Sequence, residues 1–181
     1  MNIVFEPDPI EAVRLSRKHL AGQEGIIVNI AEDVFVETGL LRSLDRDICD
    51  EKDIYVGEAI YLGGTIVVMP GDLSLCITTW GSSDLAPNIV SRSEEWLVER
   101  GINVSRNEND LLADNKKVVS WARATAVNGW CQSVVHFSIG VVDLELITKI
   151  CTKPMIKIPG ALSDYGITAE MIYEKFIKPI I

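Results

Sequence analysis

The sequence predicts an α+β fold with a mixed or largely antiparallel sheet and helices packed on it. Short apolar runs punctuated by Gly and Pro are interrupted by amphipathic segments, without the strict alternation typical of a parallel sheet. Two long apolar runs joined by Asn-Gly predict a hairpin. With 181 residues, 48% of them hydrophobic and 24% charged, the chain can bury one core, so we expect one domain over residues 1–181.

Residues 7–21 predict the first helix, because apolar side chains recur at roughly helical spacing behind an Asp-Pro pair that suits a first turn. From Gly25 the pattern changes to short apolar runs bounded by turn residues, which is typical of strands. The five predicted strands are residues 26–30, 34–36, 54–56, 65–68 and 73–80.

The second half of the chain predicts a hairpin flanked by helices. Residues 88–100 carry one apolar helix face and end before Gly101. The hairpin turns at Asn128-Gly129, a dipeptide that tolerates positive φ. Its strands are residues 117–127 and 133–142. An Asp cap and a Thr cap open two short helices, residues 143–151 and 168–177.

Charge and hydropathy exclude several classes of protein. The net charge of -9 and the absence of basic runs argue against a nucleic-acid partner. Nowhere do about 18 apolar residues run together, and the N-terminus has no basic-then-apolar leader, so we expect no membrane span and a cytoplasmic location. Four cysteines without a CxxC pair, and only two histidines, argue against a zinc site, and no bound metal is expected.

The first segment with chemical content is Leu62-Gly63-Gly64-Thr65, which is followed closely by Pro70-Gly71-Asp72-Leu73. Paired glycines between strands let the backbone approach a ligand and expose amides to a carboxylate or phosphate. The same pattern also fits a tight turn or a bulge in a hairpin.

The second segment covers residues 109–118. Asn109 and Asp110 are expected on a strand edge, followed by a polar turn at Asp114-Asn115 and by Lys117 at the start of the next strand. A lysine there can place its ammonium beside a developing anion, where a low local dielectric strengthens its effect. A solvated turn is the competing interpretation.

These residues carry a resemblance to a known family. Asn109-Asp110-Leu111, with Lys117 eight residues after Asn109, resembles the N-D-[LIV]...K signature of biotin and lipoate protein ligases. Gly63-Gly64-Thr65 resembles the family's acyl-binding loop, and residues 160–170 resemble the end of its catalytic domain. The resemblance spans roughly residues 25–177.

The resemblance implies an enzyme that attaches a lipoyl, octanoyl or biotinyl group to a lysine of an acceptor protein domain. The substrate would be a small carboxylic acid such as lipoate, octanoate or biotin, activated by ATP. By the match, Lys117 contacts the acyl carboxylate and then the acyl-adenylate. The other implied site residues are Gly63, Gly64 and Thr65 along the acyl tunnel, and Asn109 and Asp110, which fix the strand around the lysine.

The sequence departs from the family pattern where charge is needed. Active ligases carry arginines just before the glycine loop and a histidine just after it, positions that are Glu58-Ala59-Ile60 and Val68 here. Triphosphate binding normally requires positive charge, so these replacements weaken the ATP-dependent interpretation. Ser120 and Trp121 also occupy the family's small-residue stretch after the lysine.

Two further residues are candidates. The octanoyltransferase branch uses a cysteine nucleophile without ATP, and Cys151 lies near its place, where Lys117 or Lys153 could lower the thiol pKa. A buried cysteine at a helix end is the alternative. His136 is either a residue that positions substrate or a hydrogen-bonded core histidine.

Three functions follow from these patterns. The first is the acyl-transfer enzyme. The second is a noncatalytic relative that binds a small acid or a protein partner after losing the basic half of the site. The third is a role in assembly through the acidic surface, because fold alone does not fix chemistry.

Overall fold

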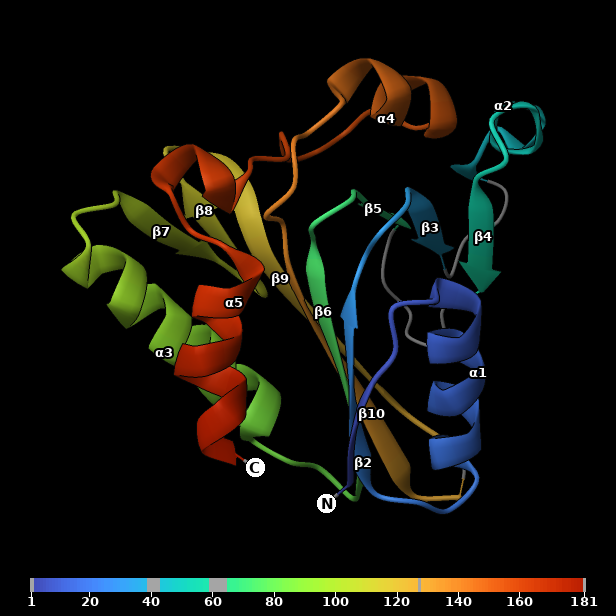
Figure 1. Ribbon diagram of the computed structural model, residues 1–181, viewed down its shortest axis with the longest axis vertical. Coiled ribbons are helices and arrows are strands. Elements are labelled where there is room, and N and C mark those ends of the chain that lie inside the picture. Colours follow the sequence, from blue (N-terminus) through green and yellow to red (C-terminus); the bar gives the residue numbers. More distant parts are fainter. Residues whose placement is uncertain (1, 39–42, 59–64, 127, 181) are drawn as a thin grey trace.

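The computed structural model describes residues 2–38, 43–58, 65–126 and 128–180, and its centre is a seven-stranded sheet (Figure 1). The strand order is β1-β2-β6-β10-β9-β8-β7, and only β1 and β2 pair in parallel. The strands are β1 (Asn2–Phe5), β2 (Gly25–Ile30), β6 (Leu73–Trp80), β7 (Val104–Asn107), β8 (Asp110–Ala113), β9 (Lys116–Thr125) and β10 (Trp130–Phe137). The predicted α+β class with a largely antiparallel sheet is confirmed.

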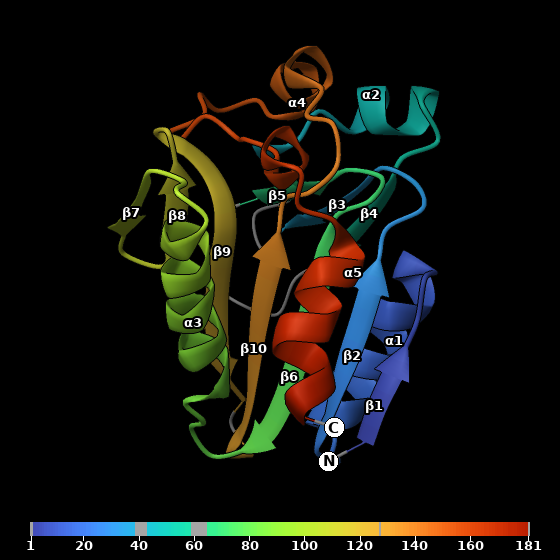
Figure 2. The same cartoon turned by 60° about the vertical axis from the view of Figure 1, so that its left-hand side comes forward.

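A second sheet of three strands lies near one end of the large sheet (Figures 1 and 2). Its central strand, β3 (Phe35–Thr38), pairs in parallel with β4 (Tyr55–Glu58) and antiparallel with β5 (Thr65–Val68). Two short helices, α2 (Arg46–Glu51) and α4 (Leu144–Ile150), lie beside it at the same end. The sequence predicted these three strands but not their separation into a sheet of their own.

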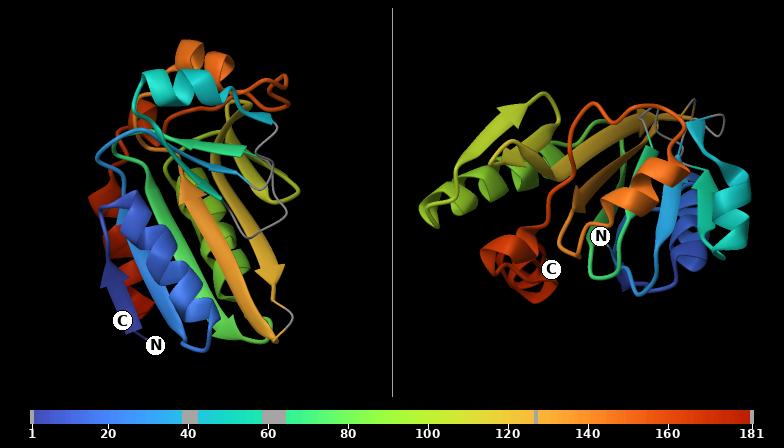
Figure 3. Two further views of the ribbon diagram at one scale, coloured as in Figure 1. Left: turned by 90° about the vertical axis from the view of Figure 1, so that its right-hand side faces the viewer. Right: turned by 90° about the horizontal axis from the view of Figure 1, so that it is seen from above.

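Helices lie on both faces of the large sheet (Figure 3). One face packs against α3 (Leu85–Glu99) and the C-terminal segment that contains α5 (Ala169–Ile172). On β6 and β10, alternate apolar residues form this core. They are Leu73, Leu75, Ile77, Val135 and Phe137. Because side chains alternate along a strand, the residues between them face α1 (Pro9–Leu20) and the small sheet.

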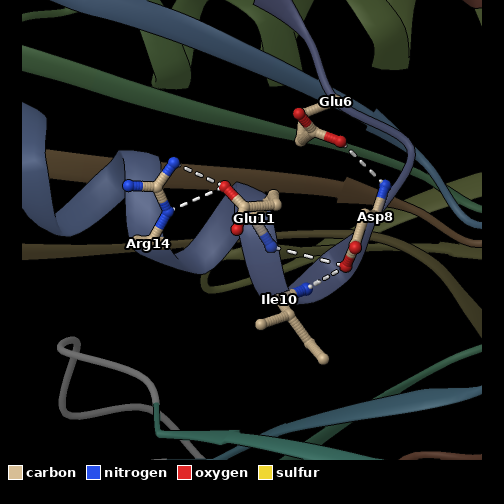
Figure 4. A network of polar contacts seen from close by, with 5 residues as sticks. All are labelled: Glu6, Asp8, Ile10, Glu11 and Arg14. Atoms are coloured by element: carbon tan, nitrogen blue, oxygen red, sulfur yellow. Dashed lines mark hydrogen bonds and ion pairs between the residues drawn. The ribbon is translucent and has the colours of Figure 1, made fainter.

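The N-terminus of α1 is fixed by the carboxylate of Asp8 (Figure 4). Its Oδ1 accepts hydrogen bonds from the backbone N–H of Ile10 at 2.8 Å and of Glu11 at 3.4 Å. Glu11 in turn pairs with Arg14 one turn later, at 2.7 Å. The predicted helix therefore begins at Pro9, directly after its capping residue.

The hairpin predicted around Asn128-Gly129 is present as β9 and β10, although the second strand spans Trp130–Phe137 instead of residues 133–142. β10 ends early because the N–H groups of Ile139 and Gly140 turn toward the carboxylate of Asp72. The sequence did not predict β1 or α2.

The predicted C-terminal helix is irregular. α5 ends at Ile172, and a π-helical turn, Tyr173–Ile177, continues it. No helix among the described residues is long and apolar enough to span a membrane.

Candidate functional site

Lys117 lies one residue after a tight turn between β8 and β9. Asp114 and Asn115 have φ of 48° and 65°, the left-handed conformation that short Asp and Asn side chains tolerate, so the polar turn predicted here is present. Directly after Lys117 the pairing with β8 shifts by one residue, which is a bulge. Lys117 is opposite Leu112, while the buried Leu111 is opposite Val119. Lys117 therefore lies on the face of the sheet that α3 and α5 do not cover.

The chain that follows α4 returns to Lys117. The N–H of Lys117 donates to the carbonyl of Ile158 at 2.8 Å, and its own carbonyl accepts from the N–H of Gly160 at 2.8 Å. Gly160 suits this approach, because an added Cβ would lie 2.7 Å from the Cβ of Lys116. The Lys117 side chain is half-buried, and within the described ranges its ammonium has no hydrogen bond or ion pair.

Asp110 has a partner that the sequence did not reveal. Its Oδ2 lies 2.6 Å from the Nζ of Lys157, and the two side chains are only 16% and 21% exposed. Lys157 also donates to the carbonyl of Asn107 at 3.4 Å. Asn109 is exposed and contributes its backbone carbonyl to the N–H of Trp121. Lys157 is 47 residues from Asp110 in a segment without periodicity, so no sequence signal could have identified it.

A polar row crosses the large sheet near Lys117. Cross-strand pairs in register place side chains on one face, and here successive pairs are polar. The row is Asn29, Ser74, His136, Ser120 and Asp110. Ser120 is 7% exposed and its hydroxyl has no hydrogen-bond partner among the described residues. A buried hydroxyl without a partner is costly, so this face is chemically suited to a polar ligand group.

Two members of this row, Ser74 and His136, form a continuous contact chain with Asp72, which precedes β6. The Nδ1 of His136 lies 3.0 Å from the Oγ of Ser74, and its Nε2 lies 3.4 Å from the Oδ2 of Asp72. His136 is 3% exposed. The structure thus places His136 in a buried polar network at the end of the sheet where Lys117 lies, and the sequence had not linked it to Asp72 or Ser74.

The carboxylate of Asp72 is buried but richly hydrogen-bonded. Oδ1 accepts from the N–H groups of Ile139 and Gly140 at 2.7 and 2.8 Å, and Oδ2 accepts from Met69 at 2.9 Å. Burial alone would raise the pKa of Asp72, but His136 and these backbone donors hold the pKa below its ordinary value. Asp72 is therefore a carboxylate anion at neutral pH.

Of the predicted glycine loop, only Thr65 is among the described residues. Gly63 and Gly64 lie outside the described residues, so their predicted contact with an acyl group stays a prediction. The Oγ1 of Thr65 lies 2.9 Å from the hydroxyl of Thr38 and 3.3 Å from that of Ser43. Val68, which the sequence resemblance aligns with the family's histidine, is 1% exposed in the apolar cluster of the small sheet.

Cys151 does not have the environment expected of an activated thiol. It is the C-cap residue of α4 and forms an isolated antiparallel β-bridge with Leu44. Burial, followed by the nearby Cys49, raises the pKa of the Cys151 thiol, and neither Lys117 nor Lys153 contributes to the shift. The condition on which a lysine would lower this pKa is therefore not met in the structure, where the partly buried thiol lies near Cys49 of α2.

A large open groove lies elsewhere, between α1, α2 and α4, with a volume of about 1250 Å³. Seven carboxylates and two lysines line it. The carboxylates belong to Asp8, Glu32, Asp33, Asp50, Asp53, Asp143 and Glu145. This excess of negative charge opposes a triphosphate in the groove. Among the described residues, no group of three or more His, Cys, Asp or Glu side chains is placed to hold a metal ion.

Comparison with solved structures identifies the fold. A bipartite lipoate protein ligase from Thermoplasma acidophilum, solved in a study of that ligase and its E2 lipoyl domain, superimposes with a TM-score of 0.72 over 98% of this chain and 80% of that chain, at 14% identity. Lipoate-protein ligase A bound with ATP gives a TM-score of 0.75 over 98% and 82%, at 13% identity. The biotin protein ligase of Aquifex aeolicus, in complex with biotin and ATP, gives 0.57 over 99% and 68%, at 13% identity.

The fold is therefore that of the lipoate and biotin protein ligases. No family model and no curated protein matches the sequence. A protein of unknown function from Pyrococcus horikoshi also shares the fold, with a TM-score of 0.58 at 13% identity. At identities this low the similarity establishes the architecture, while the chemistry depends on the residues of the site.

Proposed function

We propose that this chain transfers an acyl group of the lipoyl, octanoyl or biotinyl class to a lysine of an acceptor protein domain. The observation that supports this proposal is the position of Lys117. It is half-buried on the polar face of the large sheet, and its ammonium has no partner among the described residues. An unpaired cation there can receive the carboxylate or carbonyl oxygen of an acyl substrate, and its effect is larger than in bulk water. The shared fold with lipoate and biotin protein ligases supports this role.

We further infer that the acyl donor is an activated acyl compound instead of a free acid with ATP. The resemblance aligns the family's histidine with the core residue Val68, and the acidic Glu58 is among the residues aligned with its arginines. Both features disfavour a bound triphosphate, whose charge must be compensated. A thioester donor needs no nucleotide site.

The test compares two donors. The protein is incubated with a lipoyl-acceptor domain and either ATP with lipoate or octanoyl-acyl carrier protein, and the acceptor mass is measured. We expect octanoylation of the acceptor lysine, lost in Lys117→Ala and retained in Lys116→Ala. Lys116 is the matched control because it is adjacent and exposed, and alanine keeps the Cβ that packs on Gly160. An unmodified acceptor with both donors would overturn the proposal.

A noncatalytic acid-binding role is the second candidate, favoured by the core aliphatic Val68 where the family has a histidine. Thermal unfolding with octanoate, lipoate or biotin tests it, because a ligand that binds only the native state raises the melting temperature. A shift with one of these acids, together with an unmodified acceptor, would assign this role. No shift with any of them would exclude it.

A further inference from the structure

Ser74 has the surroundings of an activated hydroxyl. Its Oγ lies 3.0 Å from the Nδ1 of His136, and the other ring nitrogen faces the carboxylate of Asp72 at 3.4 Å. A hydroxyl, an imidazole and a carboxylate in such a chain are the parts of a nucleophile, its general base and the group that orients the base. The ring is reversed relative to the usual serine triad, since Nδ1 faces the serine here.

The charge on Asp72 determines which nitrogen of His136 carries the proton. Asp72 is an anion whose oxygens only accept hydrogen bonds, so the Nε2 facing it is the protonated nitrogen of the neutral ring. Nδ1 then has a free lone pair, and the hydroxyl of Ser74 donates to it. This is the arrangement in which His136 can take the serine proton.

Ser74 is also accessible in a way that its partners are not. It is half-buried, whereas His136 and Asp72 are 3% and 2% exposed. It lies on the polar face, and like Lys117 it is close to the end of the sheet where β6 and β9 begin. Cys76, two residues further along the same face, is no competitor, because burial, followed by the charge of Glu37, raises its thiol pKa.

We propose that Ser74 is an acyl-accepting nucleophile, with His136 as its general base and Asp72 as the residue that positions His136. The substrate class is an acyl thioester, and the product is an ester on Ser74. The proposal rests on the acyl-transfer function above, but its chemistry can be observed without any acceptor protein.

The reaction needs no groups other than Ser74, His136, the thioester and the acceptor amine. The Oγ of Ser74 attacks the thioester carbonyl while its proton moves to the Nδ1 of His136. The carbon–sulfur bond then breaks, and the leaving thiolate takes the proton from Nδ1, which yields a free thiol and the seryl ester. In the second half, a neutral lysine amine attacks the ester, His136 receives the amine proton, and Ser74 recovers it as the amide forms.

The test uses the full chain with octanoyl-N-acetylcysteamine and no acceptor. Intact mass and peptide mapping are expected to locate one octanoyl group on Ser74, absent in Ser74→Ala and reduced at least tenfold in rate in His136→Gln. Ser105→Ala is the control, since Ser105 is exposed on β7. This variant should be acylated on Ser74 at the same rate as the wild type. Ser74→Cys should restore an adduct, now a thioester, which hydroxylamine cleaves to octanoyl hydroxamate and the free thiol.

The role of Asp72 is tested by a pH profile. In Asp72→Asn the amide no longer stabilises the protonated ring, so the acylation rate should fall and its pH dependence should move to lower pH, with circular dichroism reporting whether the fold is retained. An unmodified Ser74, or acylation that persists in Ser74→Ala, overturns the proposal. If the Ser74 adduct forms but no acceptor is modified, the acyl-transfer function fails and the nucleophile stands. If Ser74→Ala still modifies the acceptor, the nucleophile fails and the transfer function stands.

Discussion

The carboxylate of Asp72 accepts a hydrogen bond from the N–H of Gly140 at 2.8 Å, and the two residues are 68 positions apart in the sequence. The contact joins the turn that precedes β6 to the chain that leaves β10. The same carboxylate accepts from Met69 and Ile139 and faces His136. One buried anion thus organises the end of the sheet where Lys117 and Ser74 lie.

Asp72→Ala is expected to destabilise the protein by about 3 kcal/mol or more, because two buried N–H groups and one partly buried N–H group lose their acceptor. Asp72→Asn should cost less, since its amide oxygen can still accept from Ile139 and Gly140. Urea unfolding measures both. Asp33→Ala, at an exposed position, is the control and should change stability by less than about 0.5 kcal/mol. Equal stability of all three variants would show that the network contributes nothing.

Gly140→Ala tests how closely the chain after β10 packs against the turn before β6. A Cβ at Gly140 would overlap the carbonyl oxygen of Pro70, a backbone atom that cannot rotate away. We expect a loss of about 3 kcal/mol in thermal or urea unfolding, at the upper end of overpacking effects. Gly57→Ala is the matched control, because its added Cβ meets neighbours only at 3.4 Å or more. If the Gly140→Ala protein were as stable as Gly57→Ala, the close approach of Gly140 to Pro70 would be contradicted.

The pH dependence of stability should contain a contribution from His19. His19 is 3% exposed, its Nδ1 has no partner among the described residues, and burial, followed by the charge of Lys18, lowers its pKa below the ordinary 6.5. The unfolded chain therefore binds a proton that the native state excludes, so stability is fully present above about pH 6.5 and is lost as the pH falls toward the lowered value.

Urea unfolding of the wild type and of His19→Leu between pH 7 and pH 5 measures this contribution. The wild type should lose more stability than the variant over that interval. The difference isolates His19 from His136, which both proteins retain. Identical pH profiles would refute the assignment.

The ion pair of Asp110 and Lys157 should contribute modestly to stability. The two side chains are partly buried and 2.6 Å apart, so a double-mutant cycle of Asp110→Asn and Lys157→Met is expected to give a coupling energy of about 1 kcal/mol. The coupling should decrease at high salt. The cycle of Glu145→Gln and Lys149→Met, an exposed pair, is the comparison and should give less. A coupling energy near zero for Asp110 and Lys157 would show that their ion pair does not stabilise the protein.

The sequence predicted the parts of this fold that depend on local patterns. Asp143 and Thr168 cap helices as predicted, the Asp-Pro pair lies at the first turn of α1, and Asn128-Gly129 turns the predicted hairpin. The division into two sheets depends on pairing between distant strands, which periodicity cannot resolve. The π-helical turn at Tyr173–Ile177 likewise has no signature in the spacing of apolar residues.

Only the part of the site that belongs to a short sequence motif was predictable. Lys117 and the turn before it were identified from a short segment. The chain of Asp72, His136 and Ser74 was not, because its members meet only through cross-strand register. The environment of Cys151 depends on its burial beside Cys49, which is 102 residues earlier and invisible to spacing.

The most direct test of the central claim is the affinity of octanoate or lipoate for Lys117→Ala and Lys116→Ala, measured by calorimetry. A charged hydrogen bond contributes about 1.5–3 kcal/mol, so Lys117→Ala should raise the dissociation constant roughly 10- to 100-fold. Lys116→Ala should bind like the wild type. Equal affinity in the two variants would contradict the claim that Lys117 receives the acyl group.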